Sequence, residues 1–302
     1  MDRRGARDDG DADRHPPRRR RHHHHVPREG GGTLVTSSLI DVPIEPDPFD
    51  AGAIRAVAFD AYGTLFHWDF REVLQQALND QGLEVDDIRE AARSFEAAWN
   101  RVSPWATRED GKLDRREMFA GPPPDFITTW EIWRRQFTGL FEDRELDGDP
   151  TLGANLFREV LSHAPAYPDA HDVVDALDAA GYRLGLLSNA DEDFLQSAVS
   201  HNRLRFSVIQ SSESLRVYKP NRAAFLELCH RLACEPGEVL YVGDSAQADV
   251  AGARHAGLRV AWLRERAGHE LPEDYPRPDF AVESLTAAAE VLGVTVPAPA
   301  TS

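Results

Sequence analysis

The sequence predicts an α/β fold in which a doubly wound parallel sheet is interrupted by an inserted helical segment. Two observations carry this prediction. In the second half of the chain, short apolar runs alternate with segments of helical periodicity, a pattern typical of a parallel sheet with helices on both faces. Between the first apolar run and the next, a long stretch has helical periodicity alone.

The first strand is predicted at residues 54–59, an apolar run that ends at Asp60 and is followed by a turn containing Gly63 and Thr64. From about residue 70 to residue 164, apolar residues recur at spacings of three and four, without the alternation of a strand. We therefore expect an all-α insertion directly after the first strand.

After the insertion, further strands are expected at residues 183–187, 206–209, 239–242, 259–263 and 280–282. Helices are expected at residues 169–180, 191–201, 221–233, 246–256 and 285–292. Gly181 and Gly257 suit the ends of two of these helices, and Asn221 suits the start of a third. Sheets of this kind bind ligands at the carboxyl ends of their strands.

The composition is that of an ordinary globular protein with an acidic surface. The 302 residues carry a formal net charge of −17, which disfavours nucleic acid and anionic membrane as partners. An anionic small-molecule substrate would therefore need a locally positive pocket. The chain has no apolar run of 18 residues and no secretory signal, so a cytoplasmic location is expected. Cys229 and Cys234 are expected to be buried structural thiols.

Residues 1–50 are predicted to be a disordered extension and linker. Residues 1–30 contain nine arginines and six acidic residues, residues 22–25 are all histidine, and almost nothing apolar is available to bury. A nucleic-acid-binding arm and a metal-binding tract are two interpretations of this composition. We favour a third, a dispensable tail or an over-extended start.

Polar residues that could bind or react with a ligand follow the predicted strands. Asp60 at the tip of a buried strand is costly unless it has a partner or a task, and Gly63 allows the backbone to approach a ligand closely. Thr64 can donate a hydroxyl hydrogen bond. After the next strand, the hydroxyl of Ser188 and the amide of Asn189 suit anionic oxygens. The plainer interpretations are a turn cap for Asp60 and an ordinary polar strand end for the other pair.

Two further clusters add charge. Lys219 is one of only two lysines, and its compact ammonium can approach two anions at once, although a solvated surface lysine is the plainer interpretation. Asp244 follows another strand and suggests a divalent cation shared with Asp60, for which magnesium is the expected choice. Alternatively, Asp244 caps the next helix. Asp249 falls early in that helix, where it can bind the Lys219 ammonium.

In this order, the clusters resemble the four signature motifs of the haloacid dehalogenase-like (HAD) superfamily, helical-cap type, over roughly residues 54–292. The resemblance implies a Rossmann-like doubly wound parallel sheet core, with the first strand central, and an inserted all-α cap domain. The implied boundaries are residues 51–68 and 165–293 for the core, 69–164 for the cap, and 294–302 for a disordered tail.

The resemblance also implies roles for residues. Asp60 would be the covalent nucleophile, Ser188 would bind the transferring group, Lys219 would neutralise charge and Asp249 would be its acidic partner. The implied ligands of Mg²⁺ are Asp60, Asp244 and the backbone carbonyl of Tyr62. The implied substrate-binding residues are Thr64, Ser188, Asn189 and Lys219.

Tyr62 departs from the pattern of the phosphatases in this superfamily, which carry a second aspartate there as the general acid and base. The string Asp-Ala-Tyr-Gly-Thr-Leu-Phe resembles instead the first motif of 2-haloacid dehalogenases, which need no metal. The fourth motif, Gly-Asp-Ser with a later Asp, resembles the magnesium-dependent phosphatases. Loss of the general acid is expected to cost about 10²–10⁴-fold in rate.

Electrostatics favours the phosphatase. Two unit charges about 4 Å apart repel by roughly 4 kcal/mol at an effective dielectric near 20, and Mg²⁺ with Lys219 would offset this for a phosphate dianion. A haloacid would need a halide pocket, and Arg134 and Arg135 in the insertion lie at the wrong spacing for the family's usual arginine. The expected activity is Mg²⁺-dependent hydrolysis of a small-molecule phosphate ester. Metal-free 2-haloacid dehalogenation and a catalytically weak metal- or phosphate-binding module are the alternatives.

The insertion is expected to determine the substrate. Its aromatic residues are interpreted mainly as core. Trp105 and the turn at residues 121–124 are candidates for loops that face the site.

Overall fold

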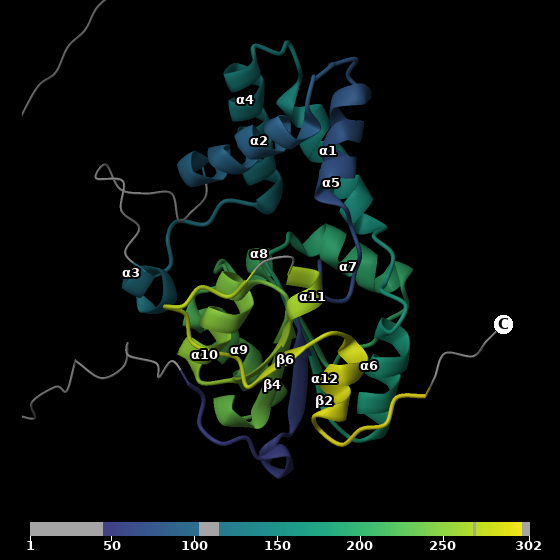
Figure 1. Ribbon diagram of the computed structural model, residues 1–302, viewed down its shortest axis with the longest axis vertical. Coiled ribbons are helices and arrows are strands. Elements are labelled where there is room, and N and C mark those ends of the chain that lie inside the picture. Colours follow the sequence, from purple (N-terminus) through teal and green to yellow (C-terminus); the bar gives the residue numbers. More distant parts are fainter. Residues whose placement is uncertain (1–44, 103–114, 268–269, 298–302) are drawn as a thin grey trace, which may run out of the picture. The chain divides into compact units, whose positions relative to one another are not determined.

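The computed structural model describes residues 45–102, 115–267 and 270–297. Its centre is a six-stranded parallel sheet with the order β3-β2-β1-β4-β5-β6 (Figure 1). The strands are β1 (Ala56–Phe59), β2 (Arg183–Ser188), β3 (Val208–Ser211), β4 (Val239–Gly243), β5 (Arg259–Leu263) and β6 (Phe280–Val282). The first strand lies inside the sheet, between β2 and β4, as predicted. Residues 1–44, Trp105 and residues 298–302 lie outside the described residues.

Strand β1 is buried on both faces, because its alternate residues contact two different apolar clusters. Val57 and Phe59 belong to one cluster, and Ala56 and Ala58 to the other. All four side chains are essentially inaccessible to solvent. A continuous apolar strand of this kind requires helices on both sides of the sheet.

Helices cover both faces of the sheet. Outside the insertion, the helices that share the cluster of Val57 are α6 (Ala170–Ala179), α7 (Glu192–His201) and α12 (Leu285–Glu290). Those that share the cluster of Ala58 are α9 (Arg222–Leu232) and α10 (Gly252–Ala256). The short elements are η1 (Ala51–Ala53), α8 (Ser212–Leu215), η2 (Pro236–Glu238) and α11 (Arg264–Ala267).

The predicted helix ends are found near the expected positions. Gly181 and Gly257 follow α6 and α10 with φ of 88°, a left-handed conformation that glycine adopts without steric cost. The side chain of Asn221 accepts a hydrogen bond from the amide of Ala223 and so caps α9, as expected.

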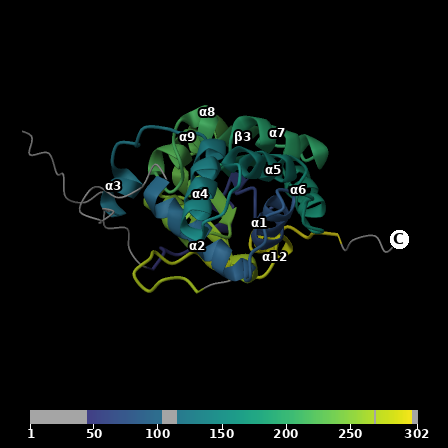
Figure 2. The ribbon, with the colours of Figure 1, turned by 90° about the horizontal axis from the view of Figure 1, so that it is seen from above.

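The insertion after β1 is helical in its described part. Its helices are α1 (Phe70–Asn79), α2 (Ile88–Val102), α3 (Arg115–Ala120), α4 (Thr129–Arg144) and α5 (Pro150–Ser162). Helices α2 and α4 pack side by side, and α5 packs on α7 of the core (Figure 1, Figure 2). Phe95, Phe137 and Phe157 form an aromatic cluster with ring centroids 4.9–5.5 Å apart. Trp133 continues this cluster to Phe194 of α7, at 5.3 Å.

Two local predictions need correction. Strand β3 begins at Val208 and not at residue 206, because Phe206 packs against Phe59 as part of the preceding loop. The helix predicted at residues 246–256 begins as a π-helical segment, η3 (Ala246–Ala251), before α10. A loop at residues 121–124 was expected, and the loop extends to residue 128; its consecutive prolines cannot supply the backbone N–H donors of a helix.

Two smaller expectations concern cysteines and membranes. Cys229 is buried and Cys234 is partly buried, and neither forms a disulfide. Within the described residues, no helix combines the length and the apolar character needed to cross a bilayer.

Candidate active site

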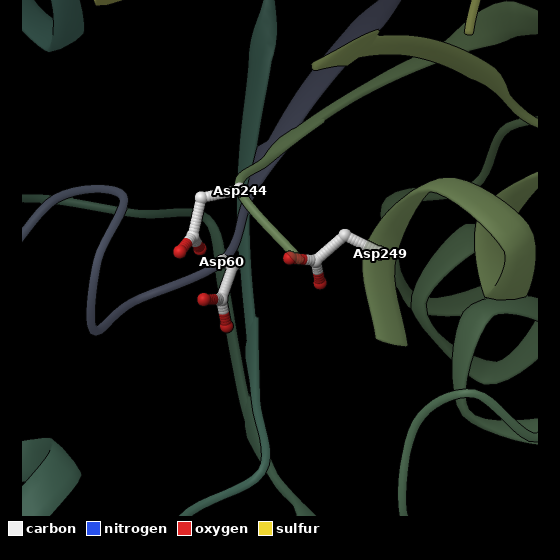
Figure 3. Close-up of side chains that lie close together, drawn as sticks. All are labelled: Asp60, Asp244 and Asp249. Carbon is white, nitrogen blue, oxygen red and sulfur yellow. The ribbon is translucent and has the colours of Figure 1, made fainter. Parts of the chain in front are cut away.

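Three carboxylates meet at one edge of the sheet. Asp60 directly follows β1, Asp244 directly follows β4, and Asp249 lies in η3. The parallel register pairs Phe59 with Val242, so the residues that follow these strands lie side by side. One carboxylate oxygen from each of the three aspartates lies within 4.8 Å of the others (Figure 3).

Lys219 joins two of these carboxylates. Its Nζ lies 2.6 Å from Oδ1 of Asp60, 2.7 Å from Oδ1 of Asp249 and 3.0 Å from the hydroxyl of Tyr241. The side chains of Lys219 and Asp249 are 2% and 0% exposed, whereas that of Asp60 is 11% exposed. Of the two carboxylates that Lys219 joins, Asp60 is therefore the one that a ligand can reach.

Burial and charge compete at this ion pair. Burial lowers the pKa of Lys219, but Asp249 and Asp60 together outweigh it, and the net pKa is raised. The ammonium form is therefore maintained. Burial raises the pKa of Asp60 to about 6, against the opposing effect of Lys219. Near neutral pH, Asp60 is thus mainly an ionised carboxylate bound to a permanent cation.

Asp244 lacks an equivalent cation. Among the described residues, its carboxylate receives one side-chain hydrogen bond, from the hydroxyl of Thr64 at 3.2 Å. Burial, Asp60 and Asp249 raise its pKa to about 8. Three carboxylates thus share one ammonium, and the site is short of positive charge. Oxygen ligands in this arrangement fit Mg²⁺, which is bound in proteins by a few carboxylates.

Two glycines make the approach of these groups possible. Gly63 has φ of 90°, and a Cβ atom there would lie 2.6 Å from Oδ2 of Asp244. A Cβ atom on Gly243 would lie 2.5 Å from the carboxylate of Asp249. Any side chain at either position would displace an aspartate of the site.

The π-helical start of η3 places Asp249. The amides of Asp249 and Val250 both donate to the carbonyl of Ser245, at 3.0 and 3.1 Å, which widens the first turn. The amide of Ser245 donates to Oδ2 of Asp249 at 2.9 Å and leaves Oδ1 for Lys219. The local backbone therefore directs one oxygen of Asp249 at the ammonium.

The four predicted substrate-binding residues differ in their surroundings. The Ser188 hydroxyl, at the end of β2, has no hydrogen-bond partner among the described residues. The Asn189 amide contacts the backbone of Lys219, accepting from its N–H at 2.7 Å and donating to its carbonyl at 2.9 Å. Thr64 faces Asp244, as described above. Asn189 thus fixes the backbone of Lys219, whereas the Ser188 hydroxyl is not engaged by any of the described residues.

Tyr62 joins the insertion to the core. Its hydroxyl lies 3.2 Å from the carbonyl of Leu161 in α5 and 3.3 Å from that of Phe194 in α7. Burial, with the nearby charge of Asp60, raises the pKa of Tyr62 far above its usual value. This hydroxyl is therefore a structural hydrogen-bond donor that links the insertion to the core.

Arg134 and Arg135, the arginines considered for a halide site, are paired elsewhere. Both contact Glu131 on the same helix, at 2.8 and 2.7 Å. Their side chains are 37% and 45% exposed, so they lie on the surface of α4.

Sequence reasoning missed Tyr241, which contacts both Lys219 and Asp249. Its hydroxyl also lies 3.1 Å from the carbonyl of Leu187, although the side chain is fully buried. A tyrosine within an otherwise aliphatic strand, two residues before Gly243, was the available signal.

Comparison with known proteins places this chain in a family. Residues 54–257 match the haloacid dehalogenase-like hydrolases, and the chain belongs to this family. It is similar to (S)-2-haloacid dehalogenase 4A of Burkholderia cepacia, with 26% identity over 248 residues, which cover 81% of this chain and 97% of the relative. It is also similar to phosphoglycolate phosphatase of Escherichia coli (strain K12), with 27% identity over 252 residues, covering 80% and 93%.

Solved structures share the fold. L-2-haloacid dehalogenase from Xanthobacter autotrophicus superimposes with a TM-score of 0.59 at 23% identity, covering 80% of this chain and 98% of the other. The chain is therefore a hydrolase of the haloacid dehalogenase-like family with a Rossmann-like core and a helical cap.

Proposed function

We propose that this protein is a Mg²⁺-dependent phosphohydrolase that cleaves a small-molecule phosphate ester through an aspartyl phosphate on Asp60. The observation that carries the proposal is the carboxylate of Asp244, which faces Asp60 without a cation of its own. Asp60, Asp244 and Asp249 share the single ammonium of Lys219, so an anionic substrate would meet too little positive charge. Asp60 and Asp244 would hold a divalent cation, which would supply the missing positive charge and keep Asp244 ionised.

In the proposed reaction, Asp60 forms and breaks the covalent bond to phosphorus, and Lys219 assists it. A carboxylate oxygen of Asp60 attacks phosphorus, the bond between phosphorus and the ester oxygen breaks, and the alcohol leaves. Water then attacks the aspartyl phosphate, which releases inorganic phosphate and restores Asp60. Lys219 keeps Asp60 ionised and oriented, and the Ser188 hydroxyl can donate to a phosphoryl oxygen. Bound Mg²⁺ would supply positive charge opposite the phosphoryl oxygens.

The leaving alcohol limits the substrate range. The Tyr62 hydroxyl is engaged by two backbone carbonyls and cannot protonate the leaving oxygen. The proton must come from water or from the substrate. Esters with acidic leaving groups are therefore expected to react faster than simple alkyl esters.

Two further proposals concern the setting of the reaction. The net charge of −17 and the absence of a membrane-spanning helix among the described residues support a cytoplasmic enzyme without nucleic-acid or membrane partners. We assign the insertion at residues 69–164 to a cap that covers the site and selects the substrate.

A second candidate is metal-free 2-haloacid dehalogenation. It is supported by Tyr62 at the position of the phosphatase acid and by the similarity to (S)-2-haloacid dehalogenases. In that reaction, Asp60 would attack the carbon that carries the halogen and release halide. Without a cation, a pKa of about 8 would keep Asp244 mainly protonated near neutral pH, so its carboxyl group would not repel a substrate carboxylate.

One assay separates the two. Purified protein is incubated with a panel of phosphate esters and with 2-chloropropionate, each with Mg²⁺ and with EDTA, beside an Asp60→Asn variant. We expect phosphate release that requires Mg²⁺ and is lost by at least about 10³-fold in the variant, because the covalent step needs the carboxylate nucleophile.

The alternatives have distinct outcomes. Halide release that is insensitive to EDTA would replace the phosphatase with the dehalogenase. Silence on every substrate, together with measurable binding of Mg²⁺ or phosphate, would indicate a binding module that retains the site.

A further inference from the structure

Arg266 contacts the loop that follows the nucleophile. It lies in α11, just after β5, and its guanidinium donates to the backbone carbonyl of Thr64. A second nitrogen donates to Oδ1 of Asp169 at 2.8 Å, and the guanidinium stacks over the ring of Tyr167 at 3.8 Å. The side chain is only 12% exposed. Three different contacts therefore fix this cation in one position.

The loop that Arg266 contacts carries two of the groups packed on Asp244. The Thr64 hydroxyl donates to Asp244, and Gly63 lies so close that a Cβ atom there would collide with it. Thr64 itself is fully buried, so its carbonyl has no water as a substitute partner. On its other side, the loop is held by Tyr167, whose amide donates to the carbonyl of Leu65 at 2.9 Å.

We propose that Arg266 is a positioning residue for the metal site: by binding the Thr64 carbonyl, it fixes the nucleophile loop against Asp244. This inference rests on the proposed Mg²⁺ site. The separation between Asp60 and Asp244 depends on this loop, because Asp60 begins it and Thr64 contacts Asp244. Partners that orient metal ligands in this way typically contribute about 10–100-fold to metal affinity.

The chain offers a matched control in Arg259, at the amino end of the same strand. Arg259 donates to the backbone carbonyl of Asp47 at 2.8 Å, pairs with Asp279 at 2.7 Å and stacks over Phe49 at 5.3 Å. Its side chain is 13% exposed. It makes the same three kinds of contact at the end of β5 away from the site. Loss of either arginine therefore removes similar interactions, but only one set touches the site.

The experiment compares Arg266→Gln, Arg266→Lys and Arg259→Gln in the full-length chain. Mg²⁺ binding is measured by titration calorimetry, and hydrogen exchange is measured in the peptide spanning residues 60–67 without metal. We expect Arg266→Gln to weaken Mg²⁺ binding by about tenfold or more and to speed exchange in this peptide by about tenfold. Arg266→Lys should fall between, because lysine cannot donate as a fork. Arg259→Gln should change neither.

Each outcome decides the proposal. Unchanged exchange at residues 60–67 in Arg266→Gln would overturn it, whatever happens to Mg²⁺. Faster exchange with unchanged Mg²⁺ affinity would limit Arg266 to loop stability and overturn its link to the metal site. Equal effects in Arg259→Gln would mean general destabilisation and would also overturn it. If the unaltered protein binds no Mg²⁺, the proposed function fails, and so does the metal role of Arg266, whereas the exchange result still tests the loop contact.

Discussion

At the scale of single residues, Asp244 is the most informative residue to test, because the protonation of its carboxyl group depends on whether a cation is bound. Its pKa of about 8 without a cation is far above the usual 3.8. The folded protein therefore retains a proton that the unfolded chain has released. Under these conditions, stability falls as pH rises through the interval between the two pKa values.

This gives a prediction for metal-free protein. Asp60 and Asp244 both contribute below pH 6, and Asp244 alone of the two contributes between about pH 6 and 8. Over that upper interval, the free energy of unfolding should fall by at most about 1.4 kcal/mol per pH unit. Asp244→Asn should flatten this part of the profile, as measured by thermal unfolding in EDTA. An identical pH profile in the variant would contradict the assignment.

The charged residues of the candidate site were also the part of the protein that the sequence predicted best. Asp60, Lys219, Asp244 and Asp249 were proposed from their places at strand and helix ends, and the structure brings them together. This works because the carboxyl ends of parallel strands lie along one edge. Their catalytic roles remain predictions. The contacts of Asn189 and Arg266 could not be predicted, because they depend on loop conformation.

At the scale of elements, the attachment of the cap to the core depends on the start of α4. Its first amides, from Thr129 and Trp130, donate to the two carboxylate oxygens of Asp191, at 2.7 and 2.9 Å. Asp191 belongs to the core and is 5% exposed. A core carboxylate therefore satisfies the free N–H groups of a cap helix, which favours one position of the cap.

We predict that Asp191→Ala loosens this attachment. The variant should lose about 1–2 kcal/mol of stability, the cost of removing a helix cap, and should show faster hydrogen exchange in residues 118–131. Asp69→Ala is the control, because the Asp69 carboxylate also accepts from two amides at a helix start, those of Arg71 and Glu72 in α1. It is exposed, however, and among the described residues its side-chain hydrogen bonds stay within its own segment. Equal exchange at residues 118–131 in the two variants would mean that Asp191 acts only as an ordinary cap.

Element prediction succeeded where periodicity was strong and failed where local contacts decide. The long helices of the insertion follow from apolar spacing alone. The π-helical start of η3 does not, because it depends on a shared carbonyl at Ser245 and on the ion pair of Asp249. The start of β3 was predicted two residues too early. Phenylalanine is typical of strands, but Phe206 packs as part of the preceding loop.

At the scale of the whole molecule, an acidic protein encloses an acidic site. The formal net charge of −17 gives every cation a weak, non-specific attraction to the surface. Specific binding must therefore be separated from this background. Binding at a specific site should be lost when one particular carboxylate is removed. For the proposed Mg²⁺ site, that carboxylate is Asp244.

Mg²⁺ should stabilise the whole fold, because a ligand that binds only the folded state adds its binding free energy to stability. At a free concentration 100 times the dissociation constant, the gain is about 2.7 kcal/mol, or roughly 5–11 °C in Tm for a chain of this size. Asp244→Asn should abolish the shift, whereas Asp178→Asn, which removes an exposed charge from α6, should retain it. Thermal unfolding with MgCl₂, against KCl at equal ionic strength, measures this. A shift of equal size in both variants would assign Mg²⁺ to the acidic surface and would leave Asp244 without the role that distinguishes the phosphatase from the dehalogenase.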